Sequence, residues 1–216
     1  MRTMMKQALS KTIIAVVGVF GLAIMSSLPA AAGDNDCVAH AAEIERDLGI
    51  PAGILASIAM VESGGGGTPN PYIMNVNGRA VFAKSAADAA KRLRDKKGRL
   101  VSSAYVGCMQ ISLRVHKAQF DSVEDIVNPR DNVRYAGQLL VRLHQEEGNW
   151  RSAIARYNGA SIRAAHGYVC KVWRYLNEFD SASARLIESN RCEEVAAAIS
   201  PRTRSSFKNA QAVEIN

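Results

Sequence analysis

Residues 51–67, PAGILASIAMVESGGGG, place a single acid at the end of an apolar run and then four glycines. Pro51 suits the first turn of a helix, where its missing N–H would have had no partner. The run from Ile54 to Val61 is apolar on nearly every side, so we expect a helix at the centre of the fold.

At the end of this helix, the helix dipole and the apolar neighbours should both raise the pKa of Glu62. A carboxyl group that stays protonated near neutral pH can donate a proton to a leaving oxygen, which makes Glu62 a candidate general acid. The glycines that follow would let a polymer pass close to the backbone, or they form a flexible connection. Taken alone, the stretch also allows an acid that is exposed or paired with an arginine.

The rest of the chain is mainly helical in pattern. Residues 71–83 contain two short strand-like runs around Asn77-Gly78, a pair typical of a hairpin turn. Ser85 can cap a helix over 86–98, and Asn128-Pro129 can start a helix that Gly148 ends. Further helices are expected over 37–49, 122–127, 149–159, 161–179 and 183–199. The sequence therefore predicts an α+β, mainly α fold with a small β-hairpin insertion.

Both ends of the chain differ from this pattern. Residues 1–32 are a basic stretch, a short apolar run and small residues with Ala30 and Ala32 at the cleavage positions, which predicts a signal peptide for export to the periplasm. The apolar run is too short for a spanning helix, so we expect no stable membrane anchor after cleavage. Residues 200–216 lack a periodic apolar face, and we expect a flexible C-terminal tail.

The charge of the exported chain is mildly basic. Residues 33–216 contain 24 basic and 20 acidic side chains, a net charge of +4. The excess is not interleaved with aromatic residues as single-strand binders require, so we expect no nucleic-acid partner. An acidic wall polymer or a lipid surface is the electrostatic partner that an exported basic protein favours.

The cysteines indicate disulfides rather than a metal site. Cys37, Cys108, Cys170 and Cys192 include no C-x-x-C pair, and the histidines show no i, i+4 spacing, so we expect neither a metal nor another cofactor. At least one disulfide is expected in an oxidising compartment. The pairing stays open: Cys170 with Cys192 is favoured, Cys37 is also available, and Cys108 fits a buried free thiol.

Four motifs in a fixed order resemble the catalytic domain of the soluble lytic transglycosylases, lysozyme-like enzymes that cleave peptidoglycan. The matching stretches are Glu62-Ser63, Gly107-Cys108-Met109-Gln110, Asn128-Pro129-Arg130-Asp131-Asn132 and Ala155-Arg156-Tyr157-Asn158-Gly159. Residues 168–172, YVCKV, resemble the helix that follows in the family. Two departures are YNGA in place of the family's Y-N-A-G and a long gap between the first two motifs. The gap places an insertion, about residues 68–104, beside the cleft of a lysozyme-like domain over 33–199.

The resemblance implies roles for individual residues. Glu62 is implied as the catalytic acid and then base. Ser63, Met109, Gln110, Tyr157 and Asn158 are implied as substrate-binding residues. Asp131 and Asn132 are interpreted as helix-start structure.

The family's chemistry also explains a single acid. The 2-acetamido group of the substrate is thought to stabilise the reaction centre, and the muramic 6-hydroxyl attacks it, so no second carboxylate is needed. A hydrolytic muramidase, with Asp88 or Asp95 reaching the cleft, is the alternative enzyme. A non-catalytic peptidoglycan-binding factor of a secretion or flagellar apparatus is the alternative outside enzymes, although Glu62 argues against it.

Overall fold

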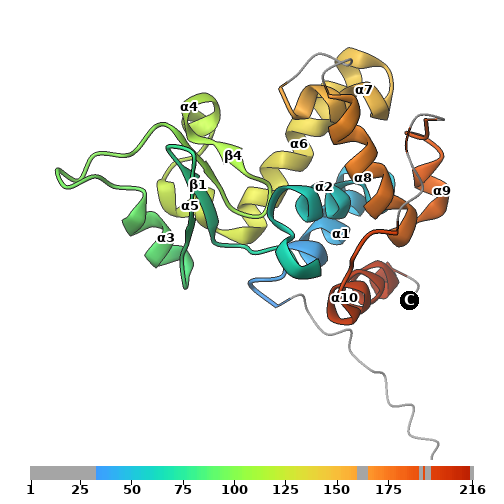
Figure 1. Cartoon of the computed structure of the whole chain (residues 1–216), viewed down its shortest axis with the longest axis horizontal. Coiled ribbons are helices and arrows are strands. Elements are labelled where there is room, and N and C mark those ends of the chain that lie inside the picture. The colour runs from blue at the N-terminus through green and yellow to red at the C-terminus, as the bar shows by residue number, and fades with distance from the viewer. Residues whose placement is uncertain (1–32, 160–164, 190–191, 193–195, 215–216) are drawn as a thin grey trace, which may run out of the picture.

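The computed structural model describes residues 33–159, 165–189, 192 and 196–214, which form a helical body joined to a smaller lobe (Figure 1). The body consists of α1 (Cys37–Leu48), α2 (Ile54–Ser63), α6 (Pro129–Glu147), α7 (Trp150–Tyr157), α8 (His166–Phe179), α9 (Ser181–Ala184) and α10 (Pro201–Gln211). The lobe consists of β1 (Ile73–Val76), β2 (Arg79–Phe82), α3 (Ala86–Arg92), β3 (Ala104–Val106), β4 (Ile111–Ser112), α4 (Leu113–His116) and α5 (Val123–Val127). Single 3₁₀ turns are η1 (Gly65–Gly67), η2 (Lys117–Gln119) and η3 (Ala212–Glu214). The expected α+β, mainly α fold is confirmed, and the expected signal peptide lies outside the described residues.

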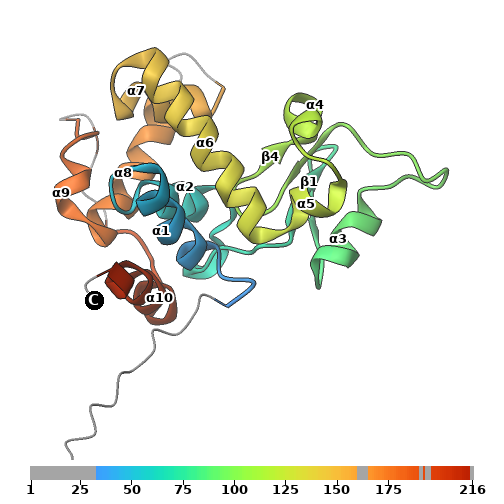
Figure 2. The same ribbon diagram turned by 180° about the vertical axis from the view of Figure 1, so that it is seen from behind.

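The apolar helix α2 is central, as its composition predicted. Ile54, Leu55 and Ile58 are fully buried, and α1 and α8 pack against this helix. Figure 2 shows α6 running beside α1 and extending from the body to the lobe. Because α2 is enclosed by other helices, its C-terminal end and Glu62 are held in a fixed position.

Capping residues set several helix ends as the sequence indicated. Ser85 accepts a hydrogen bond from the backbone N–H of Asp88, and Asn128 accepts from the first turn of α6. Gly148 ends α6 in the left-handed conformation, with φ of 73°. The helix expected over 86–98 is shorter than expected, because α3 ends at Arg92 and a turn follows.

The hairpin around Asn77-Gly78 is present and belongs to a larger antiparallel sheet with strand order β2-β1-β3-β4. Asn77 and Gly78 have φ of 51° and 80°, the positive values that a tight hairpin turn needs. Strands β3 and β4 were not expected. Met74 and Val106 are buried on one face of the sheet, whereas Tyr105 on the other face is exposed.

The expected flexible tail is wrong, because α10 occupies residues 201–211 and packs against α1. Phe207 is buried with its ring centroid 4.7 Å from that of Phe179. The hydroxyl of Thr203 donates to the backbone oxygen of Gly67 at 3.1 Å. The guanidinium of Arg46 donates to the backbone oxygen of Ala210. These contacts make the end of the chain part of the helical body.

The other corrections concern residues 181–200 and the cysteines. The helical structure expected over 183–199 is limited among the described residues to α9, and residues 196–200 are not helical. Cys37 pairs with Cys108, and Cys170 pairs with Cys192. The expectation of disulfides and the favoured pairing are confirmed, and the free thiol at Cys108 is wrong. Nowhere in the described part of the chain is a helix both long and apolar enough to cross a membrane.

Candidate active site

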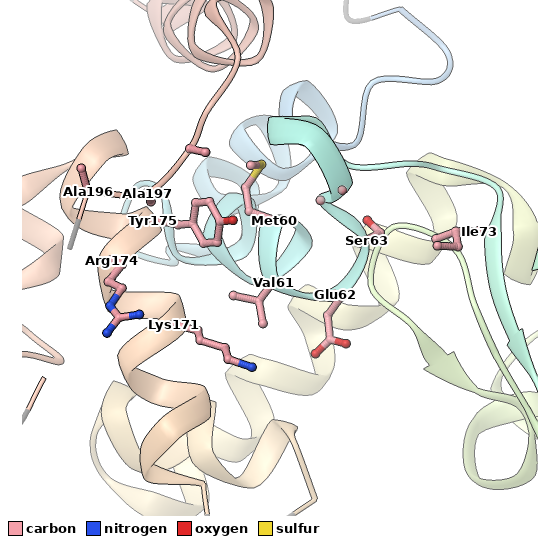
Figure 3. A pocket seen from close by; sticks show the side chains of 13 residues that line it. Met60, Val61, Glu62, Ser63, Ile73, Lys171, Arg174, Tyr175, Ala196 and Ala197 are labelled. Carbon is pink, nitrogen blue, oxygen red and sulfur yellow. The ribbon is translucent and has the colours of Figure 1, made fainter. Parts of the chain in front are cut away.

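Glu62 lies in the last turn of α2 and faces a pocket of about 510 Å³ between α2, α8 and the lobe. Figure 3 shows its carboxyl group pointing away from the helix, with the ammonium group of Lys171 extending from α8 on the same side. The lining residues are Met60, Val61, Glu62, Ser63, Gly64, Gly65, Ile73, Lys171, Arg174, Tyr175, Ala196, Ala197 and Ala198. Ile73 comes from the sheet, so the pocket lies where the body meets the lobe.

The Glu62 carboxyl group is half-buried and has a direct partner. The hydroxyl of Tyr168 on α8 donates a 2.6 Å hydrogen bond to Oε1 of Glu62. Burial raises the pKa of Glu62 above 4.5, while the Tyr168 hydroxyl and the charge of Lys171 act in the opposite direction. The net effect is a raised pKa, so the neutral carboxyl group persists to a higher pH than in a free glutamate, and its anion still has stabilising partners.

Two tyrosines flank this carboxyl group. Burial and the charge of Glu62 raise the pKa of both Tyr157 and Tyr168 well above 10. Both phenols therefore stay protonated and act as hydrogen-bond donors. Tyr157 donates to the backbone oxygen of Met109 at 2.9 Å, which connects α7 to the loop between β3 and β4.

That loop, residues 107–110, is tied to the end of α2. The hydroxyl of Ser63 donates to the backbone oxygen of Cys108 at 2.9 Å. Gly107 has φ of 79°, and a Cβ there would lie 2.7 Å from the side chain of Asn132. Gln110 has φ of 48°, and its amide donates to the backbone oxygens of Ile73 and Gly107. The loop is therefore shaped by close packing and positive φ values.

The side chain of Asn132 anchors this loop through hydrogen bonds. It is fully buried, and its amide nitrogen donates to the backbone oxygens of Val106 and Ile126 at 3.0 and 2.9 Å. Its oxygen accepts from the backbone N–H of Met109 at 2.9 Å. Asn128, four residues earlier, is the cap of α6. The interpretation of Asn132 as helix-start structure therefore missed its main contacts.

A family model described as the transglycosylase SLT domain matches residues 40–166. The chain belongs to this family. No curated protein and no solved structure gave a significant match. The matched span contains Glu62 and the loop 107–110, whereas Tyr168, Lys171 and α10 follow it along the chain. Members of the SLT family are lytic transglycosylases, and their substrate is peptidoglycan.

The predicted substrate-binding residues of this SLT domain differ in position and exposure, and of them Ser63 alone is among the described residues that line the pocket. Glu62 and Ser63 line the pocket, although the Ser63 hydroxyl is already bonded to backbone oxygens. The side chain of Met109 is fully buried and does not line a cleft. Asn158 is exposed at the end of α7. Gln110 and Tyr157 are half-buried.

Tyr168 and Lys171 are two residues close to Glu62 for which the sequence indicated no role. Tyr168 contacts Glu62 directly, and Lys171 lines the pocket three residues further along α8. The only signal for them was the likeness of YVCKV to the helix that follows in the family.

No second carboxyl group is among the described residues that line the pocket of the SLT domain. Asp88 bonds to the Arg92 guanidinium at 2.9 Å, and Asp95 bonds to that of Arg99 at 2.9 Å. Backbone N–H groups, more than these arginines, hold the pKa of each aspartate below 3.8. Among the described side chains, no group of three histidines, cysteines or acids is placed to hold a metal ion.

Proposed function

We propose that this protein is a peptidoglycan lytic transglycosylase that cleaves the bond between N-acetylmuramic acid and N-acetylglucosamine without water. The observation that carries the proposal is the environment of Glu62. It is a carboxyl group with a raised pKa in a pocket whose described lining holds no other acid. A single acid suits a reaction in which the substrate supplies its own nucleophile.

In the first step, the protonated carboxyl group of Glu62 donates its proton to the glycosidic oxygen. The bond from the muramic C1 to that oxygen breaks, and N-acetylglucosamine leaves with the proton. Positive charge develops at C1, where the substrate's 2-acetamido group stabilises it. The Glu62 carboxylate that remains accepts the hydrogen bond from Tyr168.

In the second step, Glu62 acts as a base. It takes the proton of the muramic 6-hydroxyl as that oxygen attacks C1 and closes a 1,6-anhydro ring. Glu62 ends the cycle protonated, and no water is consumed. Since the attacking hydroxyl belongs to the same sugar, holding the sugar in position supplies much of the rate enhancement.

The residues around Glu62 bind the glycan or shape the wall of the site. Gln110, Tyr157 and Asn158 contact the glycan, and Ser63 and Met109 set the form of the wall through their contacts with the loop 107–110. The glycines after Glu62 leave room for the sugar chain beside the helix end.

The proposed compartment is the periplasm, where the two disulfides would persist. Cleavage there would serve remodelling of the wall, including the local opening that an envelope-spanning secretion or flagellar apparatus requires. The proposed cleavage mechanism needs no cofactor.

Digestion of purified sacculi in water enriched in ¹⁸O tests the proposal. We expect muropeptides with anhydro ends that are lighter by one water than reducing-end products and carry no ¹⁸O. Reducing ends with one ¹⁸O would identify a muramidase. Binding to sacculi without any cleavage would identify a non-catalytic factor. The Glu62→Gln protein is the matched control for contaminating activity.

A further inference from the structure

The positive charge of the chain is concentrated in one segment, residues 84–99, which we name the basic arm. It contains seven basic and two acidic side chains, a net charge of +5. Residues 33–216 as a whole have a net charge of +4, with 24 basic and 20 acidic side chains, so the remainder sums to −1. The mild basicity of the exported chain is therefore a property of this arm.

The basic arm projects from the lobe, and buried side chains and hydrogen bonds fix its conformation. Figure 1 shows α3 and the loop after it on the side of the lobe that faces away from the helical body. Leu93 and Ala89 are fully buried at its root, and the backbone N–H of Val101 donates to the oxygen of Leu93 at 2.8 Å. The carboxylate of Asp95 accepts from the backbone N–H groups of Lys97 and Arg99, which fixes the turn.

The lysines of the basic arm are available to an external partner. Asp88 and Asp95 are engaged by Arg92 and Arg99. Lys84, Lys91, Lys96 and Lys97 are exposed, and none forms an ion pair with a described residue. Four ammonium groups thus face solvent on one projection.

The arm is joined to a wall of the active-site pocket but points beyond it. Strand β2 leads into the arm and pairs with β1, whose Ile73 lines the pocket of Glu62. A molecule bound to the arm would therefore lie away from the glycosidic bond that is cleaved, on a neighbouring part of the peptidoglycan.

The chemistry of that partner follows from the arm's surface. Among described residues the exposed large apolar side chains are Phe82, Tyr105, Val115, Leu186 and Val213, and none lies within 84–99. The arm itself carries lysines without a large exposed apolar side chain, and Phe82 is an exposed ring two residues before it, so the arm suits a hydrated polyanion better than insertion into a bilayer. The stem peptides of a peptidoglycan network carry free carboxylates and provide such a polyanion.

We propose that the basic arm binds the carboxylates of stem peptides on neighbouring strands and so retains the protein on the sacculus. The proposal rests on the proposed function for its choice of substrate. Exposed ion pairs are individually weak and screened by salt, with a Debye length of about 10 Å at 0.1 M. Retention therefore depends on several lysines together and weakens as salt rises.

Pelleting with purified sacculi tests the arm in the Glu62→Gln background, which prevents digestion during the assay. The arm variant combines Lys84→Gln, Lys91→Gln, Lys96→Gln and Lys97→Gln. A matched control removes four exposed charges from other parts of the chain, by Arg114→Gln, Arg185→Gln, Arg202→Gln and Lys208→Gln. Thermal unfolding checks that all three proteins are folded.

We expect the arm variant alone to lose about tenfold in affinity at low salt and to show a flatter salt dependence. Glycan strands stripped of stem peptides and coupled to beads should bind the arm variant and its parent equally. Equal loss in the control variant, or an arm effect that persists on stripped strands, would overturn the proposal. Tighter arm-dependent binding to vesicles containing phosphatidylglycerol would also overturn it and assign the arm to a lipid surface.

The two proposals fail in different ways. Cleavage of short soluble glycan fragments measures Glu62 chemistry and should be unchanged by the arm substitutions. If no such cleavage occurs but binding to sacculi depends on the arm, the proposed function fails and the arm inference stands. If cleavage gives anhydro ends but the arm variant pellets like its parent, the proposed function stands and the arm inference fails.

Discussion

The hydroxyl of Tyr168 donates a 2.6 Å hydrogen bond to Glu62, across 106 residues of sequence. This contact joins α8 to the end of α2 and favours the charged form of the carboxyl group, against the effect of burial. A group that first donates and then accepts a proton needs both forms to be accessible. The opposing effects of burial and Tyr168 keep the pKa of Glu62 between the extremes that either would produce alone.

Tyr168→Phe should therefore change the pH dependence of cleavage. Removing a donor to the carboxylate raises the pKa of Glu62 further, so the acid stays protonated to a higher pH. The alkaline limb of the kcat/KM profile should move upward by about one pH unit, the size expected for one hydrogen bond to a charged group. Tyr175→Phe changes another phenol that lines the same pocket and should leave the limb in place. An unmoved limb in Tyr168→Phe would show that the contact does not act on the reacting acid.

Glu62→Gln should remove nearly all cleavage while leaving the fold intact. The amide has the shape of the acid but cannot donate the required proton, and general acid–base groups are typically worth about 10²- to 10⁴-fold in rate. Turnover on sacculi and the urea unfolding curve provide the two measurements. A variant that kept more than about a tenth of wild-type turnover would exclude Glu62 from the central role.

Local signals in the sequence predicted the elements whose ends depend on one or two residues. Asn128 and Pro129 start α6, Gly148 ends it, and Asn77-Gly78 turns the hairpin, each through a backbone preference that neighbours do not alter. The position of Glu62 at the end of a buried helix followed from composition alone.

The features that the sequence did not predict depend on distant partners. Helix α10 has only one large apolar residue at its buried positions, Phe207. Its ring packs against Phe179 and lies over Gly53, where a Cβ would be 3.7 Å from Phe207. Strands β3 and β4 span three and two residues, too few for a periodic pattern. The contact of Tyr168 with Glu62 likewise depends on how α8 packs against α2.

Asn132→Ala should destabilise the protein strongly. The substitution leaves the backbone N–H of Met109 and the oxygens of Val106 and Ile126 without their partner in a buried place. Unsatisfied buried groups cost about 1–3 kcal/mol each, so we expect a loss of roughly 3 kcal/mol in the free energy of unfolding. Asn128→Ala removes an exposed cap from the same helix and should cost only about 1 kcal/mol. Equal losses in urea denaturation would show that Asn132 acts only as part of the helix start.

The two disulfides should contribute unequally to stability. Cys37–Cys108 closes 71 residues of sequence and Cys170–Cys192 closes 22, and a longer loop loses more entropy when it is cross-linked in the unfolded chain. On this model the first is worth about 4 kcal/mol and the second about 3. The double variants Cys37→Ala/Cys108→Ala and Cys170→Ala/Cys192→Ala, compared by thermal unfolding, measure the difference. A larger drop in Tm for the second pair would contradict this order.

Glu45 should make stability depend on pH. It is buried under the start of α2, where its oxygens accept from the backbone N–H groups of Gly53 and Ala56 at 2.7 and 3.0 Å. Burial, the largest influence, raises its pKa from 4.5 to about 8. Between these values the unfolded chain has released the proton while the native protein still holds it. The contribution of Glu45 to the free energy of unfolding is therefore complete below about pH 4.5 and is lost as pH rises to about 8.

The free energy of unfolding should fall by up to about 1.4 kcal/mol per pH unit across this window because of Glu45. Glu45→Gln has no proton to lose, so its stability should vary less between pH 5 and pH 8. At pH 5 the variant should be the less stable protein, because the amide nitrogen cannot accept a bond from the backbone N–H groups of Gly53 or Ala56. At pH 8 the difference in free energy of unfolding between the wild-type protein and Glu45→Gln should be smaller. Urea denaturation of both proteins over this range measures the slopes, and parallel slopes would mean that the helix start keeps Glu45 ionised throughout.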